Sequence, residues 1–340
     1  MILASEESVR DALIDSASKT AFDSGFFRIG QRSLPQAAVR SASAELRRLL
    51  HESSSERPHL ARSILSRKVG MRLPSRGIGQ TLVFEYFRRQ ICRGRSRSIG
   101  DLAHAYVQQS IIPDDVQHRP RSHYRHLVPL RRALEKELIG TEMSTPCRDY
   151  LDIALSVTET LEEAAEVFFR LVLSTVGFTG SAMEWLLMDQ SDRGVARFPG
   201  VPVRDYVRES LRLRTPACRL SRDVTKGMTV GGVRVEQGDE LLLNLFAANR
   251  DPKAFHLPDD FRPSRFGEGA GKRDLTFGLG TRSCPAQRAA LDCLQDFLIP
   301  LTADFEVSWR PRRGSKMIVG TLAIPPKGTF VIRRTAGHGV

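Results

Sequence analysis

The 340-residue chain is long enough for one large domain or two ordinary ones, and its 41% hydrophobic residues suffice for a sizeable core. Its five cysteines are scattered and do not suggest a disulfide framework, which favours a reducing, cytoplasmic location. The net charge of +12 makes nucleic acid a candidate partner, but the basic residues lack the aromatic-interleaved pattern of RNA-binding proteins, so we expect none. We also expect no membrane partner, because no uncharged apolar run reaches about 18 residues.

The first 190 residues are predicted to be mostly helical, because apolar residues recur there with helical spacing. Shorter amphipathic helices are expected over residues 6–14, 36–50, 80–91, 101–111 and 124–138. A long, largely apolar helix follows over 160–187, interrupted only by Gly177 and Gly180. Ser156 or Thr158 is expected to cap its beginning.

After residue 189 the pattern changes to shorter segments separated by Pro, Gly and Asp. A helix is expected over 203–213, strands over 231–245, a structured loop over 249–266, a helix over 284–297 and strands over 305–333.

The most informative segment runs from Phe277 to Ala286 and reads Phe-Gly-Leu-Gly-Thr-Arg-Ser-Cys-Pro-Ala. A cysteine binds iron as the thiolate, and the start of a helix behind Pro285 would favour a sulfur anion at Cys284. Glycine in the loop would let the backbone approach a flat cofactor closely. The residues alone also fit a buried structural cysteine before a helix, so both interpretations stay open at this point.

The spacing F-G-x-G-x-R-x-C-P-A resembles the cysteine-ligand loop of the cytochromes P-450 at every defining position, with Ala286 where the family usually has glycine. The resemblance implies that Cys284 is the sulfur ligand of a heme iron. It also implies that Arg282 pairs with a heme propionate, that Phe277 packs near the sulfur, and that Gly278 lets the loop approach the heme.

Two further motifs occur in the order that this family has. Glu209 and Arg212 lie three residues apart, on one face of a helix, and resemble the family's E-x-x-R pair. The pair is expected to lock to an arginine of the later loop, either Arg262 or Arg265. Arg219 resembles the arginine that pairs with a propionate where the chain turns back over the heme.

The amino-terminal resemblance is fainter. Residues 36–50 resemble the helix that lends an arginine to the heme, and Arg40 falls at that position, although Gln36 stands where Trp or His is usual. The chain is expected to lack the family's first helix and outer strand, either because it is a shortened member or because its true start lies upstream.

The predicted long helix resembles the one that crosses over the heme and carries an acid followed by a threonine. If Gly177 aligns with the family's glycine, Thr179 replaces the acid and Gly180 replaces the threonine, so the acid–alcohol pair is absent. Thr179 and Ser181 could hold waters that relay protons, or the substrate could supply a polar group. The two hydroxyls could also simply bond back to helix carbonyls.

The resemblance implies a mainly α fold with small β-sheets. A triangular single domain over 1–340 would hold heme b between the long central helix and the Cys284 helix. Residues 1–190 would be rich in helix, and 200–335 would carry the E-x-x-R pair, the β region and the cysteine loop. It further implies an oxidoreductase that activates O2 to hydroxylate or couple a small organic substrate in specialised metabolism, with a ferredoxin or flavoprotein as electron donor. Peroxide use, radical coupling, a redox-neutral reaction and a degenerate heme- or ligand-binding protein stay open as alternatives.

Overall fold

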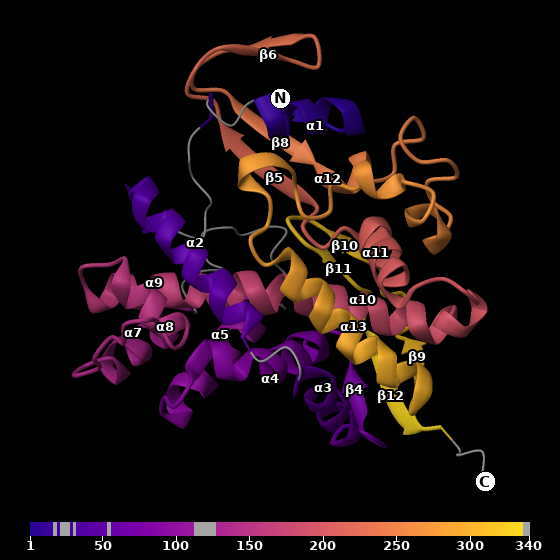
Figure 1. Ribbon diagram of the computed structural model, residues 1–340, viewed down its shortest axis with the longest axis horizontal. Helices are drawn as coiled ribbons and strands as arrows, with labels where there is room; N and C mark the ends of the chain where they lie inside the picture. Colours follow the sequence, from indigo (N-terminus) through magenta and orange to yellow (C-terminus); the bar gives the residue numbers. More distant parts are fainter. Residues whose placement is uncertain (16–18, 21–27, 30–31, 53–55, 112–126, 336–340) are drawn as a thin grey trace. The chain divides into compact units, whose positions relative to one another are not determined.

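Helices dominate the computed structural model and its sheets are small, which confirms the predicted fold class (Figure 1). The structure describes residues 1–15, 19–20, 28–29, 32–52, 56–111 and 127–335. The chain divides into two compact units. We call residues 1–22, 61–76 and 181–340 the C-terminal unit, and residues 23–60 and 77–180 the helical unit. A single domain over 1–340 stays a prediction.

Amphipathic helices follow one another along the helical unit. Their bounds are α2 (Gln36–His51), α4 (Ile78–Cys92), α5 (Arg97–Ile111), α7 (Val128–Glu137), α8 (Tyr150–Ser156) and α9 (Leu161–Val172), with β2 (Arg28–Ile29) and β3 (Arg32–Ser33) as a short hairpin. The predicted helices are confirmed where the structure describes them; residues 124–126 lie outside the described residues. Two short helices were not predicted, namely α8 and α3 (Arg57–Ser66), the latter with residues of both units.

The position of α8 depends on buried charges from distant parts of the chain. Asp149 caps the helix by accepting from the backbone N–H of Asp152 at 3.0 Å. Both carboxylates are fully buried, and Arg95, from the turn before α5, donates to Asp149 at 2.7 Å and to Asp152 at 2.6 Å. Contacts between residues so far apart in the chain leave no periodic pattern, which is why a helix of this length escaped prediction.

The long apolar helix extends from Leu161 to Asp192 as α9, a π-helical turn (Leu173–Gly177) and α10 (Phe178–Asp192). The expected caps are wrong: the cap is Thr160, whose hydroxyl accepts from the backbone N–H of Glu163 at 3.2 Å. Ser156 and Thr158 instead donate to carbonyls of α8, because they lie at its end. The boundary between the two units falls after Gly180.

By length and composition alone, one described helix, Leu161–Asp192, could cross a membrane. However, 83% of its most apolar 18-residue window is buried inside the structure. Burial of this extent is typical of a core helix.

Two small sheets organise the C-terminal unit. In the first, β8 (Glu240–Asn244) pairs in parallel with β1 (Ile2–Leu3) and antiparallel with β5 (Arg219–Asp223). Figure 1 shows α1 (Glu6–Asp15) and α12 (Leu245–Ala248) beside β8, where their apolar side chains share a core with it. The second sheet has the strand order β4 (Arg72–Pro74), β12 (Gly328–Arg334) and β9 (Phe305–Pro311). Two short antiparallel hairpins are also present. One is formed by β6 (Met228–Val230) and β7 (Val233–Val235), and the other by β10 (Ile318–Val319) and β11 (Ala323–Ile324).

The strands predicted over 231–245 end earlier than their apolar run suggests. The chain turns into α12 at Leu245, because the side chain of Asn244 caps that helix by accepting from the backbone N–H of Ala247 at 3.1 Å.

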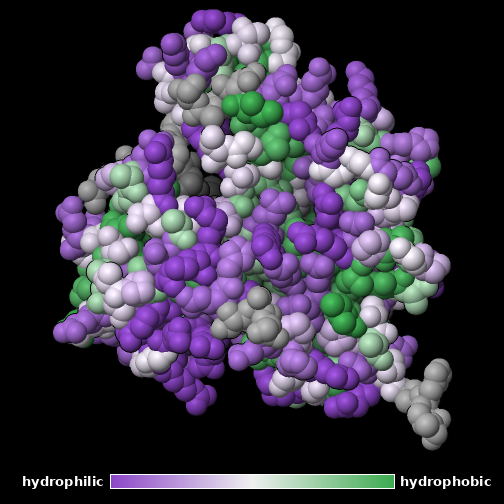
Figure 2. All heavy atoms as spheres, viewed as in Figure 1, coloured by the Kyte–Doolittle hydropathy of each residue, from purple (hydrophilic) through white to green (hydrophobic). Residues whose placement is uncertain are grey.

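Two helices carry the motifs of the C-terminal unit, namely α11 (Val203–Arg214) and α13 (Gln287–Ala303), which pack on each other. The helix predicted from Cys284 begins three residues later, at Gln287. Figure 2 shows hydrophilic residues over most of the visible face, with hydrophobic residues in smaller groups among them. This surface agrees with the high content of charged residues, 26% of the chain.

Candidate functional site

A buried ion cluster forms the base of the candidate site. The side chains of Glu209 and Arg212 are fully buried. Arg212 donates to the carboxylate at both oxygens, at 2.8 and 2.9 Å, which is the bidentate geometry of a strong charge-assisted pair. The predicted pair is therefore an internal lock of α11 and not a solvated surface pair.

The third member of the buried ion cluster is Arg265. Its Nε donates to Glu209 at 3.0 Å, and its other nitrogens donate to the backbone carbonyls of His256, Leu257 and Asp260. Arg262 contributes only its backbone N–H, which donates to Glu209 at 2.8 Å, while its side chain is partly exposed. The structure thus decides between the two arginines that the sequence left open, because the side chain of Arg265 reaches Glu209 whereas that of Arg262 lies near Glu268.

Asn249 connects the buried ion cluster to the cysteine loop, a role that the sequence did not reveal. Its backbone carbonyl accepts from Arg212 at 2.7 Å. Its side-chain oxygen accepts from the backbone N–H of Leu275 at 2.9 Å, and its side-chain nitrogen donates to the hydroxyls of Thr215 and Thr276 at 3.2 Å. Asn249 is fully buried, so these bonds hold the loop segment that leads into Phe277.

The cysteine loop is closed by a backbone hydrogen bond from Cys284 to the carbonyl of Phe277 at 2.8 Å. Gly278 and Gly280 have φ of 69° and 74°, a region that residues with a Cβ enter at a cost. A Cβ at Gly280 would lie 3.4 Å from the carbonyl oxygen of Leu13, in α1. The two glycines therefore let the loop turn back so that Phe277 and Cys284 lie side by side.

The sulfur of Cys284 lies just before α13. Pro285 and Ala286 form a turn ahead of the helix, so the prediction that Pro285 is its first residue is wrong. The backbone N–H of Ala286 nevertheless donates to the sulfur, which lowers the pKa of Cys284, while burial raises it by more. The free cysteine is accordingly a neutral thiol, and a bound cation would be needed to hold it as the thiolate.

These residues fit a heme and not a metal ion bound by protein alone. No group of three or more His, Cys, Asp or Glu side chains that could hold a metal occurs among the described residues. Heme iron needs only one protein ligand on this side, since the porphyrin supplies four. Cys284 is half-buried, whereas the other four cysteines are buried.

The other side chains that were expected to contact the heme differ in their exposure to solvent and in their hydrogen-bond partners. Arg282 donates to the hydroxyl and the carbonyl of Thr20, each at 3.1 Å. Arg219 is exposed on β5, and Phe277 and Ala286 are partly buried. Arg40 is exposed on α2, in the helical unit, so its relation to the loop is not described.

In the helix predicted to carry oxygen-handling groups, the hydroxyl of Ser181 already has a hydrogen-bond partner. Ser181 donates to the carbonyl of Ala323 at 2.8 Å, an acceptor that Trp185 shares at 2.8 Å. The hydrogen bond of Ser181 therefore has a structural role, because it connects α10 to β11. Thr179 is 7% exposed, and its hydroxyl has no hydrogen-bond partner among the described residues.

Helix α4 packs so closely against Gly180 that no side chain would fit at this position. A Cβ there would lie 2.6 Å from the backbone nitrogen of Gln80 and 2.7 Å from its Cα. Real Cβ atoms do not approach backbone so closely, hence a threonine at this position would not fit. The missing alcohol is therefore a consequence of helix packing inside the helical unit.

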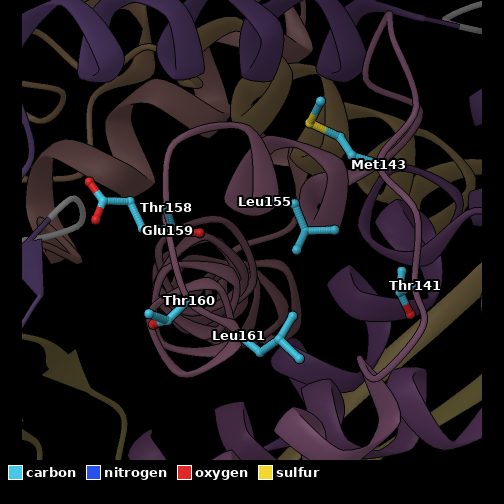
Figure 3. Close-up of a pocket in the computed structure, with 7 residues that line it drawn as sticks. All are labelled: Thr141, Met143, Leu155, Thr158, Glu159, Thr160 and Leu161. Carbon is cyan, nitrogen blue, oxygen red and sulfur yellow. The ribbon is translucent and has the colours of Figure 1, made fainter.

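One pocket in the described part of the chain contains none of the predicted site residues. It has a volume of about 300 Å³ and lies in the helical unit near the start of α9 (Figure 3). Its lining consists of Thr141, Met143, Leu155, Thr158, Glu159, Thr160 and Leu161. In Figure 3 the carboxylate of Glu159 points away from Leu155 and Leu161.

Comparison with known proteins agrees with this geometry. The family model of cytochrome P-450 matches residues 203–333. Strychnine-10-hydroxylase of Strychnos nux-vomica is 38% identical over 112 residues, which cover 30% of this chain and 21% of that protein. Demethylepipodophyllotoxin synthase of Sinopodophyllum hexandrum is 28% identical over 196 residues, which cover 47% and 38%. These matches therefore span less than half of the curated relatives' length.

Solved structures resemble the chain over a greater length. The cytochrome P-450 OxyD, involved in the biosynthesis of vancomycin-type antibiotics, has a TM-score of 0.77 at 17% identity, covering 98% of this chain and 90% of that one. EryK from S. erythraea has a TM-score of 0.72 at 18% identity, covering 100% and 91%. Identities this low establish the fold alone. The family's sequence pattern is therefore present over residues 203–333, and the fold of the chain is that of the cytochrome P-450 superfamily.

Proposed function

We propose that the protein is a heme-thiolate oxidoreductase in which Cys284 is the ligand of the iron of heme b. The observation that carries the proposal is the cysteine loop: its sulfur accepts a backbone N–H, and it is partly accessible. The loop is also fastened through Asn249 to the buried ion cluster. A loop held this firmly keeps one sulfur in a fixed position, which is what a single axial ligand requires.

The chain's own residues would bind and orient the cofactor. Arg219 is an exposed cation that suits a propionate, and Arg282 would join it by exchanging or sharing its bonds to Thr20. Phe277 would limit water at the sulfur. When bound, the heme would supply oxidative chemistry that no side chain can perform.

The substrate class is proposed from the relatives. Both plant relatives are named for steps on small organic molecules, a hydroxylase and a synthase, and OxyD is involved in antibiotic biosynthesis. We infer a small organic substrate in specialised metabolism, with electrons from a ferredoxin or flavoprotein. The basic net charge would favour an acidic donor.

A second candidate is favoured by Gly180. Since this position cannot carry an alcohol, ordinary use of O2 and reductant lacks one of its usual proton-delivering groups. A heme-thiolate enzyme that uses peroxide, couples radicals or catalyses a redox-neutral reaction would not need that group. Turnover with hydrogen peroxide alone, compared with turnover requiring reductant and O2, distinguishes the two candidates. A degenerate binding protein would bind heme and show neither.

The decisive measurement is the absorption spectrum of the heme-loaded, reduced protein under carbon monoxide. We expect a strongly red-shifted Soret band that Cys284→Ser abolishes. Cys293→Ser is the matched control, because Cys293 is a buried cysteine of α13 and should leave the band unchanged. A histidine-type band in the wild type, or the same band in Cys284→Ser, would overturn the proposal.

A further inference from the structure

Gln80 is an unusual side chain for the interior of the helical unit. It is fully buried, and neither its amide nitrogen nor its amide oxygen has a hydrogen-bond partner among the residues that the structure describes. Every other buried side chain of the described chain that lacks a partner, such as Gln90 or Tyr206, leaves only one atom unpaired. An amide left dry in this way opposes folding, so buried amides are nearly always paired with protein or water.

The position of Gln80 adds to its significance. It lies in the first turn of α4, a helix that begins at Gly77 without any side-chain cap. There its Cγ would lie 2.8 Å from a Cβ at Gly180. The residue that excludes a side chain from Gly180 is therefore the one that carries the unpaired amide. The π-helical turn Leu173–Gly177 comes directly before it, and such turns often mark functional sites.

We propose that the carboxamide of Gln80 binds a buried water molecule beside Gly180. A carboxamide offers donors and an acceptor together, and water is the smallest molecule that satisfies both. A buried water needs two to four polar partners. Gln80 supplies two, and the hydroxyl of Thr179, unpartnered among the described residues and next to Gly180 in the chain, is a third candidate.

The consequence for catalysis rests on the proposed function. The water would be held from α4 close to Gly180, the position at which the long helix lacks the family's threonine hydroxyl. Gln80 is then a positioning residue: it stays neutral, orients the water and transfers no proton itself. A water molecule bound by a residue of α4 would thus replace a side-chain hydroxyl of the long helix.

The first experiment examines the water directly and does not depend on bound heme. A crystal structure of the full-length chain, at a resolution that shows ordered water, should contain one within hydrogen-bond distance of the Gln80 amide. Gln80→Leu should lose it. Gln90→Leu is the matched control, since Gln90 lies on the same helix and leaves one atom unpaired.

Unfolding in denaturant supplies a second readout on the same variants. If the amide were truly dry, Gln80→Leu would remove an unpaired group and raise the unfolding midpoint above that of the wild type. If it holds water, the midpoint stays or falls. An empty site together with a raised midpoint would overturn the proposal.

The third measurement addresses the consequence and needs no substrate. Heme-loaded protein is reduced with dithionite, mixed with dissolved O2, and its reoxidation is followed in H2O and in D2O. We expect reoxidation to be slower in D2O for the wild type and for Gln90→Leu, and this difference to be lost in Gln80→Leu. An unchanged isotope effect in Gln80→Leu would show that the water has no part in proton delivery. A missing thiolate band in the wild type would instead sink the proposed function and leave the water site standing.

Discussion

The cysteine loop and the long helix each contain a pair of glycines, and the two pairs serve different purposes. In the loop, Gly278 and Gly280 adopt positive φ, so the backbone conformation itself demands glycine. In the helix, a Cβ at Gly177 would lie 2.7 Å from the side chain of Ile111, and one at Gly180 would lie 2.6 Å from the backbone of Gln80. The loop needs glycine for local reasons, whereas the helix needs it because of residues far away in the chain.

This difference explains why the two regions differ in how closely they follow the family's pattern. The loop retains its motif because any change alters the direction of Cys284. The helix departs from its expected acid and alcohol because its neighbours, and not its own conformation, define the space available. Four predictions test this comparison, beginning with the largest expected effect.

The strongest prediction concerns the buried ion cluster that supports the loop. Glu209→Ala leaves Arg212 and Arg265 buried without their counter-charge, which should lower the free energy of unfolding by about 3–5 kcal/mol. Denaturant unfolding measures the loss. Asp101→Ala is the control, because it breaks only an exposed pair with Arg97 and should change little. Equal effects of the two substitutions would contradict the account of a buried cluster.

Asn249→Ala should weaken the connection between the buried ion cluster and the loop. It leaves the N–H of Leu275 and the hydroxyl of Thr276 without this partner, at about 1–3 kcal/mol for each buried group left unpaired. The fraction of heme that shows the thiolate band should fall as well. Asn244→Ala removes a single capping bond of α12 and should leave the band intact. If Asn249→Ala kept the full thiolate band, its positioning role would be refuted.

Gly180→Ala tests the packing of the long helix. The added methyl group meets the backbone of α4, which cannot move aside as a side chain can, so we expect a loss of about 1–3 kcal/mol. Gly177→Ala is the matched control, because it meets the end of the flexible Ile111 side chain and should cost less. The unfolding midpoints of both variants rank the two effects, and a reversed order would argue against a backbone contact at Gly180.

At Gly278 we expect the opposite cause of destabilisation: the positive φ, and not a lack of space, should make a side chain unfavourable. Gly278→Ala is expected to cost about 1–2 kcal/mol from positive φ, although no neighbour lies closer than 3.9 Å to the new Cβ. Gly278→Asn should cost less, since asparagine tolerates this region. Gly320→Ala, where a Cβ meets nothing within 4 Å, serves as the control in the same unfolding assay. A result in which asparagine is no better than alanine would show that space is limiting here too.

Several features of the site could be predicted from sequence because their parts are neighbours in the chain. The cysteine loop lies within ten residues, and Glu209 and Arg212 lie three apart, so spacing alone indicates their geometry. The apolar periodicity likewise predicted most helices of the helical unit, since a helix buries one face at a regular interval. The roles of the individual heme contacts stay predictions.

The amino-acid sequence by itself determined the helical class of the fold, the identity of the cysteine loop and the existence of the acid–arginine pair, because these depend on local conformation and short spacing. Only the tertiary structure decided that Arg265 and not Arg262 completes the buried ion cluster, and that Asn249 connects the cluster to the loop. It also decided that Gly180 faces Gln80, one hundred positions earlier in the chain. Such contacts join residues with no regular spacing between them, so they cannot be predicted from a pattern along the sequence.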